Sequence, residues 1–93
     1  MTLRVLTHDG LALEARAVSV IACGEPGYLG MLRNHAPLVT TLKPGKLIWR
    51  LAGGASHTRM LGRGLLEVQR NHVTILTEAV SEPQEAGPTG PYS

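Results

Sequence analysis

Histidine and cysteine are the side chains in this sequence that could bind a metal ion or attack a substrate. The chain has four histidines and one cysteine, which are His8, His35, His57, His72 and Cys23. They stand singly near predicted turns and strand ends, whereas the ligands of a metal site usually include pairs a few residues apart. The spacing therefore does not indicate a metal centre. For His35 the pattern favours a bond to local backbone within a turn over a contact with a partner.

Other motifs for catalysis are also missing from the sequence. There is no Gly-x-Ser-x-Gly elbow, and Cys23 has no local base, so we interpret it as a small apolar residue. The glycine-rich segments 24–27, 52–55 and 62–64 lack the Lys-Ser/Thr ending of a phosphate-binding loop and precede strands rather than helices. Acidic residues are too few and too dispersed for a paired-carboxylate site. We expect a binding or structural module that is not an enzyme and needs no cofactor.

The length and charge of the chain limit its possible partners. Its 93 residues suffice for one compact domain with a modest core. Nine Lys and Arg against seven Asp and Glu give a formal charge of +2, and the positive residues are scattered along the sequence. The three aromatic residues, Tyr28, Trp49 and Tyr92, do not lie in a basic cluster on which bases could stack. Nucleic acid is therefore not an expected partner.

Cysteine usage fits a reducing compartment, and hydropathy bears on membrane segments. A single cysteine excludes an internal disulfide, which makes the cytoplasm the default location. No apolar run approaches the roughly 20 residues that span a bilayer, and the first ten residues lack the apolar core of a signal peptide. We expect any membrane contact to go through a partner.

The first part of the chain has the period-two pattern of strands. Residues 3–7 alternate, and His8-Asp9-Gly10 has the composition of a hairpin turn. Residues 11–22 alternate too, but the parity of the apolar positions changes near Ala17, which suggests a bulge. A helix over 11–22 is the alternative, because Leu, Ala, Glu and Arg favour helix, although the Val-Ser-Val-Ile run favours a strand.

The middle of the chain is divided by proline and glycine. Gly24-Glu25-Pro26-Gly27 predicts a turn before a short strand at 28–32. Pro37 prevents a helix around His35-Ala36-Pro37, and a strand at 38–42 follows. Lys43-Pro44-Gly45 has the composition of a type II turn.

The remaining strands are predicted at 46–51, 57–61, 66–68 and 73–77, with an extension over 78–80. Gly62-Arg63-Gly64 suggests a bulge or corner. From Ser81 the sequence is rich in proline and glycine, so we expect a folded domain at 1–80 and a disordered tail at 81–93. Many short strands joined by turns predict an all-β sandwich or barrel.

Five sequence segments carry a family resemblance. They are Gly-Tyr-Leu-Gly-Met-Leu at 27–32, His-Ala-Pro-Leu at 35–38, Leu-Lys-Pro-Gly at 42–45, Gly-Leu-Leu-Glu-Val at 64–68 and Asn-His-Val-Thr-Ile-Leu-Thr at 71–77. In this order they resemble the N-terminal β-sandwich domain of the ε subunit of the rotary F-type ATP synthase, called δ in mitochondria. The resemblance covers about residues 3–80.

This resemblance implies a flattened sandwich of two sheets with about ten short strands. It also implies a non-catalytic rotor subunit in the central stalk of the F1 complex, which links the γ subunit to the c ring during ion-driven ATP synthesis. The expected location is then peripheral, on the cytoplasmic face of the bacterial inner membrane. The alternatives are an ε-like subunit of another F-type ATPase, such as a sodium-translocating one, and an unrelated all-β protein-binding module. A small metal-dependent β-barrel enzyme ranks last.

The resemblance also implies roles for individual residues. Positions matching those that face γ are Thr7, His35 and Thr40. Tyr28 matches the ring-facing position, where relatives often carry an acidic residue, and Arg33 is expected to supply a charge beside it. The turns expected to hold this geometry contain Gly27, Gly30, Pro37, Pro44 and Gly45.

The sequence departs from the family pattern at three places. Arg33-Asn34 replaces a usual Pro-Gly, and Asn34 is expected to keep the turn by adopting positive φ. Gly62-Arg63-Gly64 replaces a usual Ser-Gly-Gly. Many family members continue into a C-terminal helical hairpin linked to inhibition of ATP hydrolysis and to ATP binding, and we assign neither property to this sequence.

Overall fold

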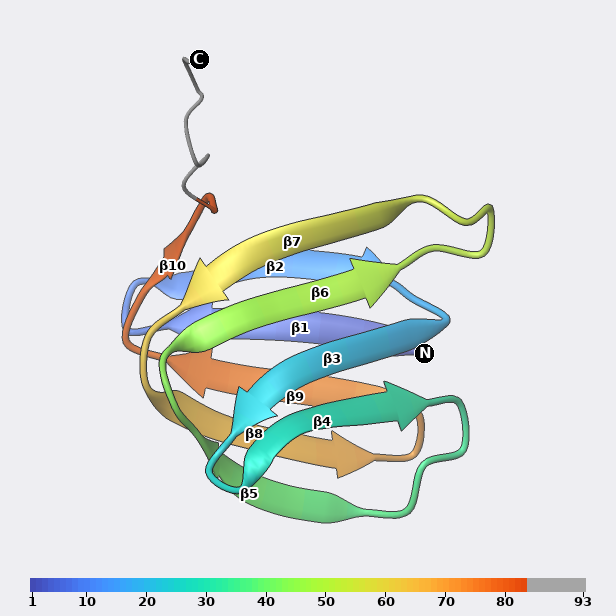
Figure 1. Ribbon diagram of the computed structural model, residues 1–93, viewed down its shortest axis with the longest axis horizontal. Helices are drawn as coiled ribbons and strands as arrows, with labels where there is room; N and C mark the ends of the chain where they lie inside the picture. The colour runs from blue at the N-terminus through green and yellow to red at the C-terminus, as the bar shows by residue number, and fades with distance from the viewer. Residues whose placement is uncertain (84–93) are drawn as a thin grey trace.

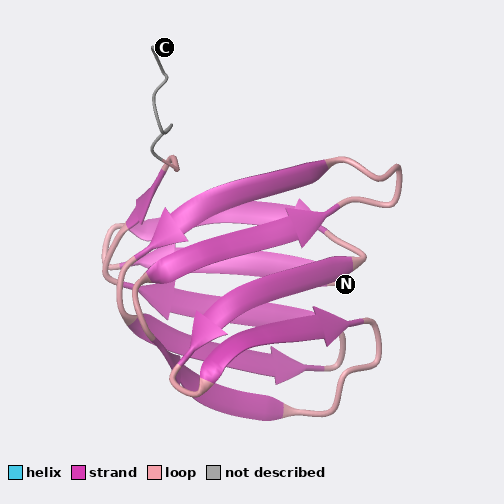
Figure 2. Cartoon of the chain, viewed as in Figure 1, coloured by secondary structure: helices cyan, strands magenta, loops and turns pink. Residues whose placement is uncertain are grey.

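The computed structural model describes residues 1–83, which form ten short strands (Figures 1 and 2). The strands are β1 (Thr2–Thr7), β2 (Gly10–Arg16), β3 (Ser19–Gly24), β4 (Gly27–Leu32), β5 (Leu38–Leu42), β6 (Gly45–Arg50), β7 (Ser56–Leu61), β8 (Gly64–Gln69), β9 (His72–Thr77) and β10 (Val80–Ser81). No residue between 1 and 83 is helical, so the helical alternative for residues 11–22 is wrong. The all-β prediction is confirmed.

The strands form two layers that belong to one continuous sheet. In Figure 1 the layer β4-β3-β6-β7-β10 lies in front and the layer β5-β8-β9-β1-β2 behind. The layers join where β3 meets β5, at the single pair Gly24 and Leu42. All neighbouring strands are antiparallel except β1 and β9. The structure is thus a flattened sandwich with one folded sheet running through both layers.

The core lies between the layers and takes side chains from both. Alternate residues of a strand point to opposite faces, so each layer places one apolar set inside. The largest fully buried side chains are Leu3, Val5, Val20, Met31, Leu47, Leu66, Val73 and Ile75. Burial of each side chain of this kind is worth about 1.5–3 kcal/mol relative to exposure. This packing holds the surface residues described below in place.

The strands run between two ends of the sandwich. The loops at 17–18, 33–37, 51–55 and 70–71 lie at the right-hand end in Figure 1, with the N-terminus, and we call this the N-terminal end. The turns at 8–9, 25–26, 43–44, 62–63 and 78–79 lie at the other end, called the Tyr28 end.

The change of parity near Ala17 is a change of layer, not a bulge. β2 ends at Arg16 in the rear layer and β3 begins at Ser19 in the front layer. The connection is fixed by backbone bonds from the Ala17 N–H to the Met1 carbonyl and from the Val18 N–H to the Arg50 carbonyl, both 2.8 Å. The irregular pairing in this region lies earlier, between Val5 and Leu6 on β1.

Two glycine predictions need correction. Gly45 is the first residue of β6 and lacks the positive φ that the third position of a type II turn requires. A Cβ atom on Gly45 would lie only 2.7 Å from the Cβ of Cys23, so glycine is needed here for close approach. Gly30 lies within β4 rather than in a turn. Gly27 does follow a turn and has a φ of 138°.

The predicted corner at Gly62-Arg63-Gly64 is confirmed and carries the chain between layers, from β7 to β8. The predicted extension after residue 77 is a separate short strand, β10, which pairs Val80 with Leu61 and Ser81 with Met60. Most of the predicted tail, from residue 84, lies outside the described residues.

Candidate functional site

The histidines of residues 1–83 lie apart from one another in the fold. No group of three or more His, Cys, Asp or Glu side chains within this range comes together as metal ligands. His8 lies at the Tyr28 end, whereas His35, His57 and His72 lie at or near the N-terminal end on separate elements. The described part of the chain also has no helix that could cross a membrane.

Tyr28 lies on the outer face of the front layer, near the Tyr28 end. It pairs across the hairpin with Cys23, and its side chain is 59% exposed. Its hydroxyl oxygen lies 3.6 Å from the position that a Cβ atom on Gly45 would take. The absence of a side chain at Gly45 thus leaves room for Cys23 and the Tyr28 ring. An aromatic ring with a polar tip, exposed in this way, is suited to a protein contact.

Arg33 is not near Tyr28. The two residues stand at opposite ends of β4, which at the rise of a strand separates their Cα atoms by about 16 Å. The expectation that Arg33 supplies a charge beside Tyr28 is therefore wrong in its geometry. Arg33 instead begins the loop at the N-terminal end that contains His35.

The loop at 33–37 is fixed by local bonds and by one distant partner. Asn34 has a φ of 66°, as predicted for the residue that replaces glycine. Its N–H donates to the side-chain oxygen of Asn71 over 2.6 Å. The His35 N–H donates to the Leu32 carbonyl over 3.1 Å, and the His35 ring Nδ1 lies 2.6 Å from the Ala36 carbonyl oxygen. The His35 ring is thus held by local backbone, as the pattern predicted.

Thr7, His35 and Thr40 do not form one cluster. Thr7 ends β1 at the Tyr28 end, where its hydroxyl accepts a bond of 3.2 Å from the Asp9 N–H. Thr40 lies in the middle of β5 and is half-buried at the margin of the rear layer. The three residues therefore mark two ends and one flank of the rear layer.

An exposed apolar row crosses the outer face of the rear layer, and sequence reasoning did not identify it. Strand pairing places Leu65 beside Leu76, Leu76 beside Leu6, and Leu6 beside Leu11. Leu11 and Leu76 are both 51% exposed, and Val39 on β5, which pairs with Glu67 two residues along β8 from Leu65, is 64% exposed. A shallow groove is lined by Val39, Leu65, Glu67, Thr74 and Leu76. We call Leu6, Leu11, Val39, Leu65 and Leu76 the rear apolar row.

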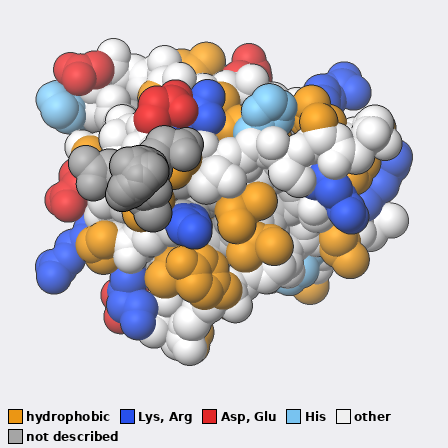
Figure 3. Space-filling model, turned by 45° about the horizontal axis from the view of Figure 1, so that its top comes forward, with side chains coloured by type: hydrophobic (Ala, Val, Ile, Leu, Met, Phe, Trp, Pro, Cys, Tyr) orange, Lys and Arg blue, Asp and Glu red, His pale blue; other side chains and the backbone are white. Residues whose placement is uncertain are grey.

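The signal for this row was present in the sequence. Residues 65–66 and 75–76 are apolar at both parities, which a strand with one solvated face does not require. The front layer carries exposed apolar side chains as well, notably Ile21, Tyr28 and Leu32, and Figure 3 shows hydrophobic side chains on this side. Both outer faces thus have apolar residues available for contact.

Comparison with known proteins places the chain in a family. The family described as ATP synthase, Delta/Epsilon chain, beta-sandwich domain matches residues 1–83. An ATP synthase epsilon chain from Moorella thermoacetica is 36% identical over 85 residues, which are 91% of this chain and 63% of the relative. One from Xanthomonas euvesicatoria is 44% identical over 81 residues, 87% of this chain and 58% of the relative. The chain spans about three-fifths of the length of these relatives.

Two solved structures contain chains of the same fold. One is the Euglena gracilis mitochondrial ATP synthase with OSCP, F1 and the c-ring, where the TM-score is 0.77 at 24% identity, over 84% of this chain and 50% of that chain. The other is the central stalk and c-ring of the Tetrahymena thermophila mitochondrial ATP synthase, with a TM-score of 0.73 at 16% identity, over 87% and 65% of the two chains. Since the family match covers residues 1–83, this chain belongs to the family of the β-sandwich domain of ATP synthase delta and epsilon chains.

Proposed function

We propose that this chain is a non-catalytic subunit of the central stalk of an ATP synthase, where it links the γ subunit to the c ring. Its relatives are named ATP synthase epsilon chains, and chains of its fold occur in structures of the central stalk and c-ring. Its role is mechanical: it transmits torque between an ion-driven ring and the catalytic part of the enzyme. It associates with the cytoplasmic face of the bacterial inner membrane only through these partners.

The rear apolar row is the observation that carries this proposal. Several large apolar side chains that are 40–64% exposed lie next to one another on one sheet face. Monomeric proteins rarely expose such contiguous patches, and permanent interfaces bury them. We assign the rear layer to the γ subunit, with Thr7 and His35 at its two ends and Thr40 on its flank. A rigid sandwich that presents a broad apolar face is suited to transmit force without slipping.

Tyr28 is our candidate for the ring contact. Its ring is exposed and supported beneath by Cys23 and the glycine at 45. Tyrosine is enriched among the residues that dominate binding energy at protein interfaces. Arg33 lies at the other end of β4, so we place it with His35 rather than with the ring contact.

Co-purification with the γ subunit tests the proposal. Leu76→Asp puts a charge into the rear apolar row and is expected to abolish capture of γ. Ile21→Asp makes the same kind of change at an exposed position of the front layer, away from the loop of His35, and is the matched control. Equal capture by both variants and the unchanged chain would refute the assignment of the rear layer, and failure of the unchanged chain to capture γ would refute the function itself.

A second measurement tests Tyr28. Tyr28→Ala is expected to retain γ and to weaken attachment of the assembled stalk to membranes that contain the c ring. Unchanged coupling between ion flow and ATP synthesis in that variant would remove Tyr28 from the ring contact.

A further inference from the structure

We propose that the N-terminal end of the sandwich binds an acidic protein surface. The end is rimmed by Arg16, Arg33, Arg50 and Arg70, which we call the arginine rim. Within the ATP synthase, the arginine rim faces away from the Tyr28 end and its ring contact. That position in the complex rests on the proposed function. The preference for an acidic partner rests only on the charges and side chains of this end.

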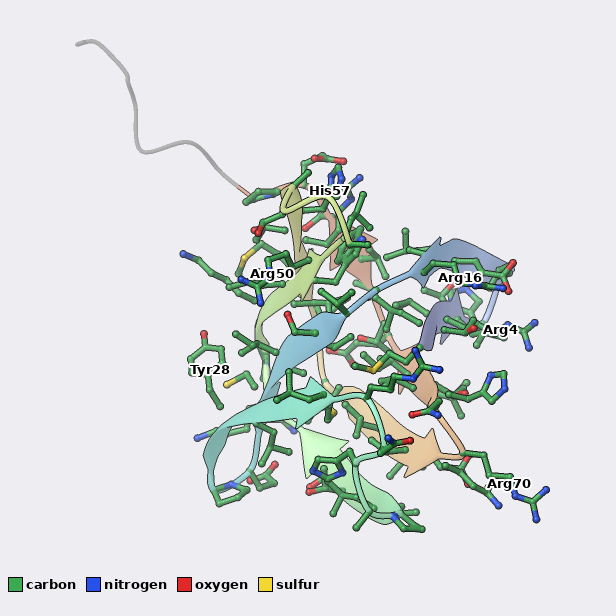
Figure 4. All side chains as sticks on the ribbon, turned by 90° about the vertical axis from the view of Figure 1, so that its right-hand side faces the viewer. Arg4, Arg16, Tyr28, Arg50, His57 and Arg70 are labelled. Atoms are coloured by element: carbon green, nitrogen blue, oxygen red, sulfur yellow. The ribbon has the colours of Figure 1, made fainter. Side chains whose placement is uncertain are left out.

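The fold gathers positive charges that the sequence disperses. Arg16 and Arg50 are the last residues of β2 and β6, and Arg33 and Arg70 immediately follow β4 and β8. All four strands end at the N-terminal end of the sandwich. Figure 4 views this end and shows Arg16 and Arg70 on one side of the sandwich and Arg50 on the other. The four side chains are exposed.

The loops of this end carry no acidic residue, and the acidic side chains nearest to the arginine rim lie on the strands, where Glu14 lines a hollow with Arg16 and Glu67 lines one with Arg70. The connecting segments 17–18, 33–37, 51–55 and 70–71 contain neither Asp nor Glu. The arginine ion pairs of the described residues lie elsewhere, from Arg4 to Glu14 at 3.5 Å and from Arg59 to Glu82 at 3.2 Å.

The turns at the opposite end carry charges of both signs. Asp9, Glu25 and Glu78 occupy its turns, together with Lys43 and Arg63. In Figure 3 the acidic side chains lie mostly toward the left, whereas Lys and Arg on the right have none beside them. A strand of six residues separates the two ends by about 16 Å or more, which exceeds the physiological screening length of about 8 Å. A partner at one end therefore experiences the charge of that end.

The composition of the arginine rim favours a protein partner. All four cations are arginines, which form paired bonds with carboxylates and are enriched at protein interfaces, whereas lysines are depleted there. The exposed side chains of Val18 and Leu32 lie beside them, because Ser19 pairs with both Leu32 and Arg50. No Phe, Tyr or Trp side chain is exposed at this end among the described residues, so bases have no stacking platform there. An apolar contact with an arginine border is the pattern of a protein interface.

Association kinetics test this proposal. The chain is removed from the purified ATP synthase, and its rebinding is followed at increasing salt concentration. Arg50→Glu and Arg16→Glu are expected to slow association tenfold or more at low salt and to flatten its salt dependence, as for charge-steered encounters. Lys43→Glu changes the net charge equally at the Tyr28 end and is expected to have a much smaller effect. Equal effects at both ends, or none at either, would overturn the proposal.

Two further measurements separate this inference from the proposed function. With a photoreactive residue at position 18, the intact complex is expected to yield a cross-link to an acidic peptide of another subunit, and a cross-link to a non-acidic segment overturns the proposal. In the second measurement, binding of the chain alone to a glutamate-rich peptide, to a single-stranded polynucleotide and to phosphatidylglycerol vesicles is compared. Arginine-dependent binding of the peptide is expected, and stronger binding of the polynucleotide or vesicles overturns the proposal. If γ is captured but the arginine variants behave as the unchanged chain, the function stands and only this inference fails.

Discussion

Asn34 and Asn71 bind each other across 37 residues of sequence, and both have left-handed backbone. Their φ angles are 66° and 63°. The Asn34 N–H donates to Oδ1 of Asn71 over 2.6 Å, and Nδ2 of Asn71 donates to Oδ1 of Asn34 over 3.4 Å. The bonds join the loop that contains His35 to the turn between β8 and β9. A segment that links the two layers is thereby fixed to the rear layer.

This pair leads to a prediction about the His35 loop. Asn71→Gly keeps the positive φ but removes the amide, so it should cost about 0.5–1.5 kcal/mol of folding stability. Asn71→Ala should cost about 1–2 kcal/mol more, because alanine resists left-handed backbone. Urea unfolding measures both values. Faster hydrogen exchange of the Asn34 N–H in the glycine variant, with the core unchanged, shows that the loop is released; unchanged exchange would contradict this account.

Gly64 is predicted to be irreplaceable. A Cβ atom at this position would collide with the Leu76 carbonyl oxygen on the paired strand, and backbone cannot move aside as a side chain can. Gly64→Ala should lower stability by about 2–3 kcal/mol, the cost of overpacking a rigid site. Gly30→Ala is the matched control, because nothing lies within 4 Å of its Cβ position. Thermal unfolding compares them, and equal midpoints would refute the steric argument.

Thr77 is predicted to hold the corner between the layers. Its buried hydroxyl lies 3.0 Å from the Gly62 carbonyl, 3.1 Å from that of Arg63 and 3.3 Å from that of Ala79. Thr77→Val keeps the shape but removes the hydroxyl proton. The Arg63 and Ala79 carbonyls keep their backbone donors, the N–H groups of Glu78 and Gly62, so the Gly62 carbonyl loses its donor, which should cost about 1–3 kcal/mol. Thr41→Val changes an exposed threonine and should be nearly neutral. Chemical denaturation distinguishes the two variants. An unchanged free energy of unfolding in Thr77→Val would show that water replaces the hydrogen bond of the lost hydroxyl.

Arg59 is predicted to shield Trp49 from water. Its guanidinium carbon lies 5.5 Å from the centre of the Trp49 ring, and His57 stacks on that ring at 5.4 Å. Arg59→Ala should expose the indole, so the fluorescence maximum shifts to longer wavelength. Lys46→Ala changes a residue of β6, the strand that also carries Trp49, and should leave the emission unchanged. Since Trp49 is the only tryptophan, its emission reports this site alone, and an unshifted maximum in Arg59→Ala would contradict the contact.

Local chemistry in the sequence was enough to predict most of the strands. Residues 3–7 and 73–77 alternate because each side of a strand meets a different environment, and proline and glycine mark the turns at 24–27 and 62–64. The positive φ of Asn34 was predictable for the same reason, since asparagine tolerates left-handed backbone better than most residues. These features depend on residues close in sequence, and the family motifs add the order of the elements.

Pairings between distant segments could not be predicted in this way. The parity change at Ala17 has the same sequence pattern whether the strand bulges or passes to another layer, and only the neighbours of β2 and β3 distinguish the two. Gly45 was expected to serve a turn, but its role depends on Cys23, which packs against it from another strand. Tyr28 and Arg33 are five residues apart in sequence, and the extended backbone of β4 separates them by its whole length.

The sequence by itself therefore determined the all-β class, most of the turns and the family of this chain, because these follow from local conformation and from short motifs. The tertiary structure decided which side chains share a surface. It placed the rear apolar row across neighbouring strands of one layer, and it brought Arg16, Arg33, Arg50 and Arg70 to one end. The physical reason is that strand pairing and layer packing join residues far apart in sequence, and the charges and apolar groups of a surface act through those distances in space.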